Sequence, residues 1–326
     1  MAIPVMHDQS EEVVEPSAYD YEELLIDGDL LVFSSCAAVE YGRSPEEYTL
    51  AEILQNIESR IHQMRRRVKA KKVRIFFTDE ENFRYKIMPE YKSNRINAWI
   101  PDSLHAAKSH ITVMFHGEKV RGLEADDLLA INQKTDGSTI VATIDKDIPQ
   151  IRGHHYRWET PHRGEKIFVV EGTGELVAHK KPIPSKPGRF KTEIKGNGAR
   201  FFCYQLLVGD PTDGVMGCGK LVTKTYKTGA KAGQEYTVRE GIGPVQAYEL
   251  LEYAITYQRC MEVVIHQYKH HFGDDWENQL LRNGRCLYMV NKRRPDGKFL
   301  LWHFRADCVK DSWYDPATSE VVRLEG

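Results

Sequence analysis

The sequence predicts an α/β fold in which a mainly parallel central sheet carries helices on both faces. Short apolar runs that are typical of buried strands alternate with segments in which leucine and isoleucine recur at helical spacing. Such alternation favours parallel strands in a sheet whose two faces are both covered. Three of the apolar runs lead to an aspartate, at Asp27, Asp79 and Asp145. Ligands bind beyond the carboxyl ends of such strands, which makes these positions candidates for a site.

The first segments of the chain are predicted to supply two strands and a helix. Residues 1–23 are acidic and predict a flexible extension ahead of the fold. The run 24–33 (LLIDGDLLVF) predicts a buried strand with polar groups towards its carboxyl end, and 72–79 (KVRIFFTD) predicts a second strand. Between them, apolar residues at helical spacing predict a helix within 45–72.

The middle of the chain is predicted to supply an insertion, two strands and a helix. Residues 80–110 are basic and aromatic, and a segment of this length within an α/β unit is more often functional than idle. The runs 111–115 (ITVMF) and 138–145 (STIVATID) predict strands, and 123–131 (LEADDLLAI) predicts the opening of a helix between them.

The rest of the chain is predicted to be more varied. Residues 155–180 predict antiparallel strands with a Gly-Thr-Gly turn, and the Pro-, Gly- and Lys-rich residues 181–200 predict a loop. Residues 203–214 (CYQLLVGDPTDG) predict a strand that ends in carboxylates. A Gly- and Lys-rich insertion at 219–240 precedes a mainly helical region at 241–290.

Composition excludes several classes of protein. The net charge of −2, from 45 basic and 47 acidic residues, argues against a polycation that coats nucleic acid indiscriminately. No run approaches the roughly 18 apolar residues of a membrane helix, and the N-terminus lacks the order of a signal peptide. The six cysteines are scattered without a CxxC pair. We therefore expect a soluble, cytoplasmic protein that does not associate with a membrane.

Carboxylates gather at the predicted strand ends. Taken singly, each has an ordinary structural explanation, because aspartate caps turns and helices, and acidic residues suit a helix N-terminus. Their convergence is what favours a site. The residues expected to converge are Asp27, Asp79, Glu124, Asp126, Asp127, Asp145, Asp147, Asp210 and Asp213.

A cleft with this many carboxylates requires cations. Carboxylates that share a cleft repel one another, raise each other's pKa values and destabilise the fold unless positive charge neutralises them. Oxygen ligands without His or Cys select Mg²⁺ or Mn²⁺ rather than zinc. Two such ions about 4 Å apart stabilise the attacking and leaving oxygens of phosphodiester cleavage. Asp29, beside Asp27, is expected to contact a metal-bound water.

Basic residues border the predicted cleft. Arg84, Lys86, Lys92, Arg95 and Lys108 lie in the 80–110 insertion, where a cationic lid would offset the repulsion of a polyanion by the carboxylates. A second candidate phosphate stripe, for which a solvated loop is an equal alternative, comprises Lys180, Lys181, Lys186, Arg189, Lys191 and Lys195. His154, His155 and His162 lack metal-ligand spacing and are expected on the surface or in a hairpin.

Five segments occur in an order that resembles a known family. They are LLIDGDLLVF, FFTDEENFRYKIMPEYKSNR, GLEADDLLA, TIDKDIPQI and LLVGDPTDGVMGCG. The chain resembles the 5′-nuclease superfamily of flap endonucleases and 5′–3′ exonucleases, whose fold is PIN-like, over roughly residues 24–255. It is most similar to the small bacteriophage 5′–3′ exonucleases. Order and spacing together are more specific than any one motif.

The resemblance implies roles for individual residues. The nine carboxylates named above become metal ligands, with Asp27, Asp126 and Asp145 also counted as catalytic. Lys92 and Arg95, in PEYKSNR, would stabilise charge on the phosphate, and Tyr91 would stack on a terminal base. Residues 80–110 would form the family's helical arch. The implied DNA-binding residues are Arg84, Lys86, Tyr91, Lys92, Arg95, Gly217, Gly219, Lys220, Gly241 and Gly243.

The glycine motif departs from the family pattern. In the family, the GDxxD motif leads promptly into a helix-hairpin-helix whose backbone amides bind duplex phosphates. Here VMGCGK (215–220) begins such a hairpin, but the 219–240 insertion separates it from EGIGPVQAYELLEYA (240–254). Either GCG or GIG could contact phosphate, or the hairpin could be split and bridged by the insertion. K⁺ at the hairpin is a further expectation.

The expected organisation and function follow from these residues. Residues 24–214 would form the catalytic domain, 215–290 the helical DNA-binding region, and 291–326 a tail of unknown role. The expected activity is a divalent-metal-dependent 5′–3′ exonuclease or flap endonuclease acting on DNA with 5′ ends or flaps. RNA–DNA hybrids are a further substrate class to consider. The resemblance also implies a monomer, a replication-protein partner, and phage DNA replication or degradation in the host cytoplasm.

Two other functions remain open at this stage. Asp27-Gly-Asp29 after an apolar strand also fits a haloacid-dehalogenase-type phosphatase with Asp27 as nucleophile, although that alternative leaves EADD and TIDKD unexplained. A nonenzymatic DNA-binding relative would show gaps in the carboxylate set, and the sequence has none of these gaps.

Overall fold

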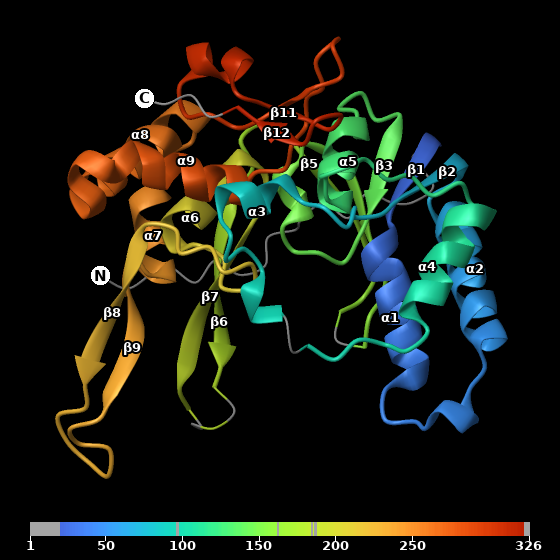
Figure 1. The fold of residues 1–326 in the computed structure, drawn as a ribbon, viewed down its shortest axis with the longest axis horizontal. Coiled ribbons are helices and arrows are strands. Elements are labelled where there is room, and N and C mark those ends of the chain that lie inside the picture. Colours follow the sequence, from blue (N-terminus) through green and yellow to red (C-terminus); the bar gives the residue numbers. More distant parts are fainter. Residues whose placement is uncertain (1–19, 96–97, 162, 184, 186–187, 323–326) are drawn as a thin grey trace.

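The computed structural model describes residues 20–95, 98–161, 163–183, 185 and 188–322. Figure 1 shows an N-terminal half built on a central sheet and a C-terminal half built mainly of helices, with the end of the chain lying above both. No helix in the described part of the chain is long and apolar enough to cross a membrane.

The central sheet has the strand order β2-β1-β3-β4-β5. Its strands are β1 (Tyr21–Asp27), β2 (Ala70–Phe76), β3 (Thr139–Ala142), β4 (Gly153–Arg157) and β5 (Lys166–Val170). The first four are mutually parallel, and β5 is antiparallel to β4. The predicted mainly parallel sheet with helices on both faces is therefore confirmed. The 24–33 run is divided: β1 ends at Asp27 and the rest of the run is helical.

Helices cover one face of this sheet through an apolar layer. They are α1 (Gly28–Glu40), α2 (Leu50–Arg67) and α4 (Leu104–Met114), at the right of Figure 1. The buried residues of α2, Ile53, Ile57, Ile61 and Met64, recur every three or four positions. They share a core with Leu24 and Ile26 of β1, because alternate residues of a strand face the same side.

The opposite face is covered by α5 (Ala125–Asn132) and by the end of the chain. Leu25 packs in a second core with Leu129 of α5 and with Phe299 and Tyr314. The latter two lie in a small sheet of β10 (Phe299–Leu300), β11 (Trp313–Asp315) and β12 (Glu320–Val321). The described part of the tail, for which no role was predicted, thus completes the core of the N-terminal half.

The C-terminal half has its own core. It consists of α6 (Gly198–Val208), α7 (Pro244–Leu251), α8 (Tyr257–Phe272) and α9 (Trp276–Leu287). The buried hydroxyl of Tyr268 donates to the Leu206 carbonyl at 2.7 Å, which ties α8 to α6. The short helix α3 (Phe83–Ile87) packs against α9 and so links the two halves.

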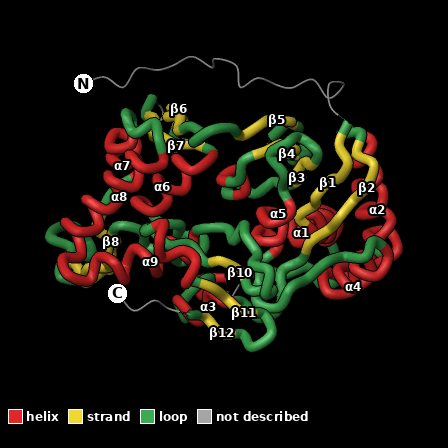
Figure 2. The backbone as a smooth tube through the Cα atoms, turned by 90° about the horizontal axis from the view of Figure 1, so that it is seen from above, coloured by secondary structure: helices red, strands yellow, loops and turns green. Residues whose placement is uncertain are grey.

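Two antiparallel ribbons project from the helical half. One is β6 (Leu176–Pro182) with β7 (Phe190–Gly196), and the other is β8 (Gly219–Thr225) with β9 (Glu235–Gly241). They point the same way in Figure 1, and Figure 2 shows that they lie on different sides of the helices. The predicted loop at 181–200 therefore contains the end of β6 and all of β7, and the predicted insertion at 219–240 is largely the paired strands β8 and β9. The Gly-Thr-Gly turn joins β5 to β6, which do not pair with each other.

Two predicted strands are wrong. The runs 111–115 and 203–208 lie in the helices α4 and α6 instead. In α4, Ala107 and Ile111 are buried one turn apart, while Val113 and Met114 are exposed. Helix α6 is buried almost throughout, so its apolar run carries no period that distinguishes it from a strand.

The histidines of β4 are not surface residues. His154 and His155 are both buried, and the ring of His155 stacks on Phe168 at 5.3 Å. Nε2 of His155 lies 2.8 Å from the Ile151 carbonyl, which makes it the protonated nitrogen of a neutral ring. Burial lowers the pKa of His155 to about 4. His162 lies outside the described residues.

We predict that this buried ring makes folding sensitive to acid. The folded state takes up the His155 proton only near pH 4, whereas the unfolded chain does so near pH 6.5, so stability falls as pH drops below about 6.5. At pH 5 this loss is about 2 kcal/mol. Urea unfolding measures the free energy of unfolding at pH 7.5 and at pH 5. Its decrease between these two pH values should be smaller by that amount in His155→Gln than in the unsubstituted protein. An equal drop in both would contradict the prediction.

Candidate active site

A cavity of about 600 Å³ opens at the carboxyl ends of β1 and β3, where the sheet meets the helical half. Its wall comprises the turn into α1, the start of α5, the loops after β3 and α6, and the 3₁₀ turn Ser93–Arg95. The predicted carboxylates that line it are Asp27, Glu124, Asp126, Asp145, Asp147, Asp210 and Asp213. The structure therefore brings seven of the nine into one space.

The junction of β1 and α1 fixes Asp27. Its Oδ1 accepts from the Leu30 backbone at 3.1 Å as the N-terminal cap of α1, and its Oδ2 accepts from the Thr143 hydroxyl at 2.8 Å. A side chain at Gly28 would begin only 2.6 Å from the Phe77 ring. Glycine at this position therefore allows the helix to start close against the neighbouring segment.

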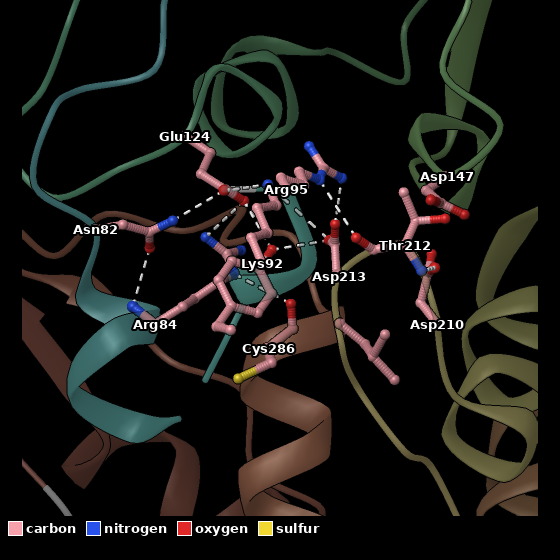
Figure 3. Close-up of polar contacts among 12 residues, drawn as sticks. Asn82, Arg84, Lys92, Arg95, Glu124, Asp147, Asp210, Thr212, Asp213 and Cys286 are labelled. Atoms are coloured by element: carbon pink, nitrogen blue, oxygen red, sulfur yellow. Dashed lines mark hydrogen bonds and ion pairs between the residues drawn. The ribbon is translucent and has the colours of Figure 1, made fainter. Parts of the chain in front are cut away.

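Lys92 occupies the centre of a charged network on one side of the cavity (Figure 3). Its Nζ lies 2.5 Å from Oε1 of Glu124 and 4.0 Å from Oδ2 of Asp213. Arg95 pairs with the other oxygen of Asp213 at 2.5 Å. The backbone of Lys92 has a φ of 57°, an unfavourable value for a residue with a side chain, and its N–H donates to the Asp213 carbonyl at 2.9 Å. Strained residues held in place in this way cluster at functional sites.

A second network lies across the cavity. Lys146 Nζ is 3.3 Å from Asp210 and 3.9 Å from Asp147. Gln205 of α6 donates to Asp147 at 2.7 Å, and the Asp147 backbone donates to the Asp145 carboxylate at 2.7 Å. The loop after β3 is thereby fastened to the helical half, so both halves of the chain determine where these carboxylates lie.

Several carboxylates in the cavity resist ionisation. Burial, reinforced by the charge of Asp29, raises the pKa of Asp27 to about 7. Burial and the charge of Asp145 raise the pKa of Asp147 to about 8, and the same causes raise the pKa of Asp126 well above its usual range. These groups need additional positive charge to be fully ionised near neutral pH.

Glu124 behaves differently because basic side chains surround it. Although burial opposes its ionisation, Lys92 and Arg84 lower the pKa of Glu124 to about 2. Lys146 likewise lowers the pKa of Asp210 against the effect of burial. The close lysine contacts of Glu124 and Asp210 thus favour the charged form of these two carboxylates, whereas burial dominates at Asp27, Asp126 and Asp147.

Two predicted metal ligands lie outside this cavity. Asp79 Oδ2 accepts from the Gly122 backbone at 3.0 Å and shapes the turn before α5. Asp127 is fully buried, where its two oxygens bind the guanidinium of Arg84 at 2.8 Å each and also accept from the Val290 backbone. A structural partner therefore occupies each of these carboxylates.

Asp29 lies inside the cavity, where its sequence position beside Asp27 had given it only an indirect role. Its Oδ2 accepts from the Thr78 backbone at 2.9 Å, and its Oδ1 pairs with Lys108 of α4 at 2.5 Å. Lys108 is thus the residue that brings the 80–110 segment to this edge of the site.

Arg84 and Lys86 do not face the cavity as free cations. Arg84 is buried, with its guanidinium between Asp127 and the carbonyls of Cys286 and Tyr288. It therefore joins α3, α5 and α9, and this placement does not support a role in DNA binding. Lys86 reaches the tail instead, where its ammonium contacts the Ser319 carbonyl.

The ring of Tyr91 is also unavailable for stacking. Tyr91 is buried, and its hydroxyl lies 2.9 Å from Asp213 and 3.2 Å from Glu124. Its hydrogen bonds fix the carboxylates around Lys92, and this placement does not support the implied base-stacking role. Tyr85, whose ring lies 6.0 Å from that of Tyr91, is the exposed tyrosine of this pair.

The two glycine motifs come together at the base of the β8–β9 ribbon. The Ile242 N–H donates to the Cys218 carbonyl at 3.1 Å, and Gly219 pairs with Gly241 in the ribbon. Gly243, which precedes α7, has open space where a side chain would project. The two motifs thus lie side by side, and the predicted contact of GCG or GIG with phosphate stays a prediction. Gly217 follows the GDxxD loop and Lys220 is exposed on β8.

Sequence reasoning missed several residues of this site. Lys146 and Thr143 flank the predicted aspartates in TIDKD and could have been found from that motif. Gln205 belongs to a run interpreted as a strand, and nothing local marks it. Arg157 and Arg163 also line the cavity, from β4 and the turn that follows it, and only the tertiary structure places them there.

The chemistry of the cavity suits divalent cations. Its acidic lining is composed of carboxylates, the oxygen donors that Mg²⁺ and Mn²⁺ prefer. Burial and neighbouring carboxylates raise the pKa values of Asp27 and Asp147, and a bound cation would favour the ionised form of both. Among the described residues, no three His, Cys, Asp or Glu side chains are grouped tightly enough to hold an ion as they stand. The donor types fit a metal, and binding would draw the carboxylates closer together.

Comparison with known proteins identifies the N-terminal half. Residues 22–173 match the family model described as 5′-3′ exonuclease, N-terminal resolvase-like domain. This range contains the central sheet and the first five of the seven predicted carboxylates that line the cavity.

Two curated proteins are similar in sequence. The flap endonuclease Xni of Shewanella baltica is 28% identical over 144 residues, which is 42% of this chain and 53% of Xni. The 5′-3′ exonuclease of Buchnera aphidicola is 24% identical over 219 residues, which is 62% of this chain and 67% of that protein. The match to Xni thus spans about half of its length.

A solved structure shares the fold. The bacteriophage T5 D15 flap endonuclease, solved as a variant complexed with DNA and metal ions, aligns with a TM-score of 0.52 and 14% identity. The alignment covers 81% of this chain and 88% of the T5 protein.

The family match, the two curated relatives and the shared fold agree with the motif order in the sequence. The resemblance of the chain to the 5′-nuclease superfamily is therefore confirmed, with the family model matching residues 22–173.

Proposed function

We propose that the protein is a divalent-metal-dependent 5′–3′ exonuclease or flap endonuclease that hydrolyses DNA phosphodiester bonds. The observation that carries the proposal is the single cavity in which seven predicted carboxylates from both halves of the chain face Lys92 and Arg95. The curated relatives bear these two activities as names, which supports the same assignment here.

The carboxylates supply the metal ligands in this proposal. Asp27, Asp126 and Asp145 on one side and Asp147 and Asp210 on the other would hold two or more Mg²⁺ or Mn²⁺ ions. Bound there, the metals would supply Lewis acidity for the attack of water on phosphorus and for the departure of the leaving oxygen. The structure of the T5 protein, which holds DNA and metal ions, supports the same class of cofactor.

Lys92 and Arg95 carry the positive charge that would face the phosphate. Lys92 is mostly buried, and Glu124 and Asp213 raise its pKa against the effect of burial, so it stays protonated. A fixed ammonium next to the scissile phosphate stabilises the charge that develops on its oxygens without reorganisation of solvent. Arg95 is half exposed and lies further out, where it would position the incoming strand.

The substrate would be DNA with a 5′ end or flap, and the two halves of the chain would have separate roles in cleavage and in duplex binding. Residues 24–214 would catalyse, with the 80–110 segment as an arch over the cavity. Residues 215–290 would bind duplex through amides at the glycine motifs, with K⁺ as a candidate ion there. The proposal also includes RNA–DNA hybrids as a further substrate class and a replication protein as a partner. It places the activity in phage DNA replication or degradation in the host cytoplasm.

Product analysis tests the proposal. Purified protein should release short labelled products from a 5′-labelled duplex or 5′-flap substrate in Mg²⁺ and none in EDTA. Intact DNA together with rapid release of phosphate from a small phosphomonoester would replace the proposal by a phosphatase with Asp27 as nucleophile. DNA binding without cleavage in Mg²⁺ or in Mn²⁺ would indicate a nonenzymatic relative.

Asp126→Asn and Asp145→Asn should each reduce DNA cleavage by about 10³-fold, because each removes a carboxylate charge from the metal site. Binding to the same DNA in EDTA should be equal or tighter, since an acidic charge near the phosphates has been removed. Asp274→Asn, at an exposed position in the 3₁₀ turn before α9, serves as the matched control. Full cleavage by both site variants would overturn the metal assignment.

Lys92→Ala should slow the single-turnover cleavage step by about 10²–10³-fold while changing the dissociation constant for DNA much less. The reason is that the ammonium acts on charge that develops during reaction. Lys119→Ala, at an exposed position between α4 and α5, is the control. A loss confined to affinity would assign Lys92 to substrate positioning.

A further inference from the structure

A groove of about 370 Å³ continues from the active-site cavity. One wall is formed by β4 and β5 and the other by the β6–β7 ribbon, through residues such as Lys166 and Lys195. Five residues line both spaces, namely Ile144, Asp145, Lys146, Arg157 and Arg163. The groove therefore begins at a proposed metal ligand and leads away from it between two strand pairs.

Arg157 and Arg163 stand at the junction of the two spaces without a counter-charge. Within the described part of the chain, neither guanidinium forms an ion pair with a carboxylate. Arg157 contacts only the Gly164 carbonyl, at 3.5 Å, and its Nε is buried without a hydrogen-bond partner. Burial and the neighbouring charge of Arg163 lower the pKa of Arg157, as expected for two cations placed together.

The other charges of the groove do not neutralise this pair. Glu193 is paired with Lys181 at 3.5 Å, and Glu175 receives a hydrogen bond from Asn197 at 3.3 Å. Lys146 is engaged with Asp210, while Lys195 is exposed on β7. Five basic residues and three acidic residues line the groove, the acidic ones being Asp145, Glu175 and Glu193. The groove thus retains an excess of positive charge, as expected for a surface that follows a phosphate backbone.

We propose that Arg157 and Arg163 form a phosphate subsite that holds the substrate strand one step away from the scissile phosphate, and that the groove carries this strand in single-stranded form. Two guanidinium groups side by side can bind the oxygens of one phosphate bidentately. The groove encloses only about 370 Å³ between the two strand pairs, which favours a single strand as its occupant. The proposal rests on the proposed nuclease function.

The bound phosphate can come from two sources with the same chemistry. It can be an internal phosphodiester of a longer 5′ strand or the terminal phosphate of a 5′ end. Comparison of a 5′-phosphorylated duplex, the same duplex with a 5′-hydroxyl, and a 5′-flap substrate distinguishes them. If the site binds a terminal phosphate, Arg163→Gln should weaken binding of the 5′-phosphorylated duplex alone. If it binds an internal phosphodiester, Arg163→Gln should weaken binding of the 5′-flap substrate.

The test measures binding of fluorescent DNA in EDTA across a series of salt concentrations. Arg157→Gln and Arg163→Gln should each weaken binding of the preferred substrate about fivefold to tenfold at 0.1 M salt. The slope of log affinity against log salt should become shallower by about 0.7, the value for one single-strand phosphate contact. Lys72→Gln, on an exposed position of β2 away from the carboxyl end, removes one positive charge as a matched control.

Conservative replacement separates binding from a merely structural role. Arg157→Lys should retain most of the salt slope and lose part of the affinity, because lysine keeps the charge but not the bidentate geometry. Unchanged affinity and salt slope in both glutamine variants would overturn the subsite, and so would an equal loss of affinity in Lys72→Gln. If the unsubstituted protein still cleaves DNA, the proposed nuclease function stands without the subsite. Absence of both DNA binding and cleavage in the unsubstituted protein would overturn both.

Discussion

The carboxylates gathered at one edge of the parallel sheet are the feature on which the rest of the site depends. Parallel strands place their carboxyl ends together, and here Asp27 and Asp145 meet there with Asp126 at the start of α5. Burial, reinforced by the charge of Asp29, raises the pKa of Asp27 to about 7, so full ionisation of this carboxylate near neutral pH requires nearby positive charge. The surrounding lysines and the proposed cations both follow from this imbalance.

Internal cations relieve only part of that repulsion, and they do so selectively. Lys92 pairs with Glu124 and Asp213, Lys146 with Asp210 and Asp147, and Lys108 with Asp29. Within the described part of the chain, Asp27, Asp126 and Asp145 form no ion pair with a lysine or arginine. An oxygen-lined space that keeps unneutralised carboxylates would attract divalent ions and repel a bare polyanion. In this account metal binding comes first and makes the cavity acceptable to a phosphate, which the flanking arginines then hold.

The site also depends on a joint between the two halves of the chain. Arg84 is buried between Asp127 and backbone carbonyls near the end of α9, and Gln205 of α6 holds Asp147. Removal of one partner from a buried ion pair such as Arg84–Asp127 typically lowers the free energy of unfolding by about 3–5 kcal/mol. The residues of this joint therefore act on the geometry of the site through the carboxylates and carbonyls that they hold in place.

The sequence predicted the acidic cavity better than it predicted the elements around it. Strands β1, β2 and β3 were recognised because each apolar run leads into a polar segment, and seven of nine carboxylates meet as expected. Helices α4 and α6 were mistaken for strands because short apolar runs lack a distinguishing period. Asp127 and Arg84 could not be assigned correctly, since their pairing joins residues 43 apart in the sequence and fills a buried space.

Basic residues were the least predictable part of the site. The sequence does not indicate whether a lysine or arginine will pair internally, as Arg84 does, or form no ion pair with any described residue, as Arg157 does. That difference is decided by the neighbours that tertiary structure brings together. The two glycine motifs could each be recognised in the sequence, and the structure shows that they meet at the base of the β8–β9 ribbon.

The most direct test of the central claim is a calorimetric titration of the metal-free protein with Mn²⁺. The account predicts that the protein binds two ions, that its thermal unfolding temperature rises with Mn²⁺, and that Asp145→Asn loses at least one of the two ions. Asp274→Asn should behave like the unsubstituted protein. Absence of Mn²⁺ binding, or an identical titration in Asp145→Asn, would contradict the claim that this cavity is a metal centre.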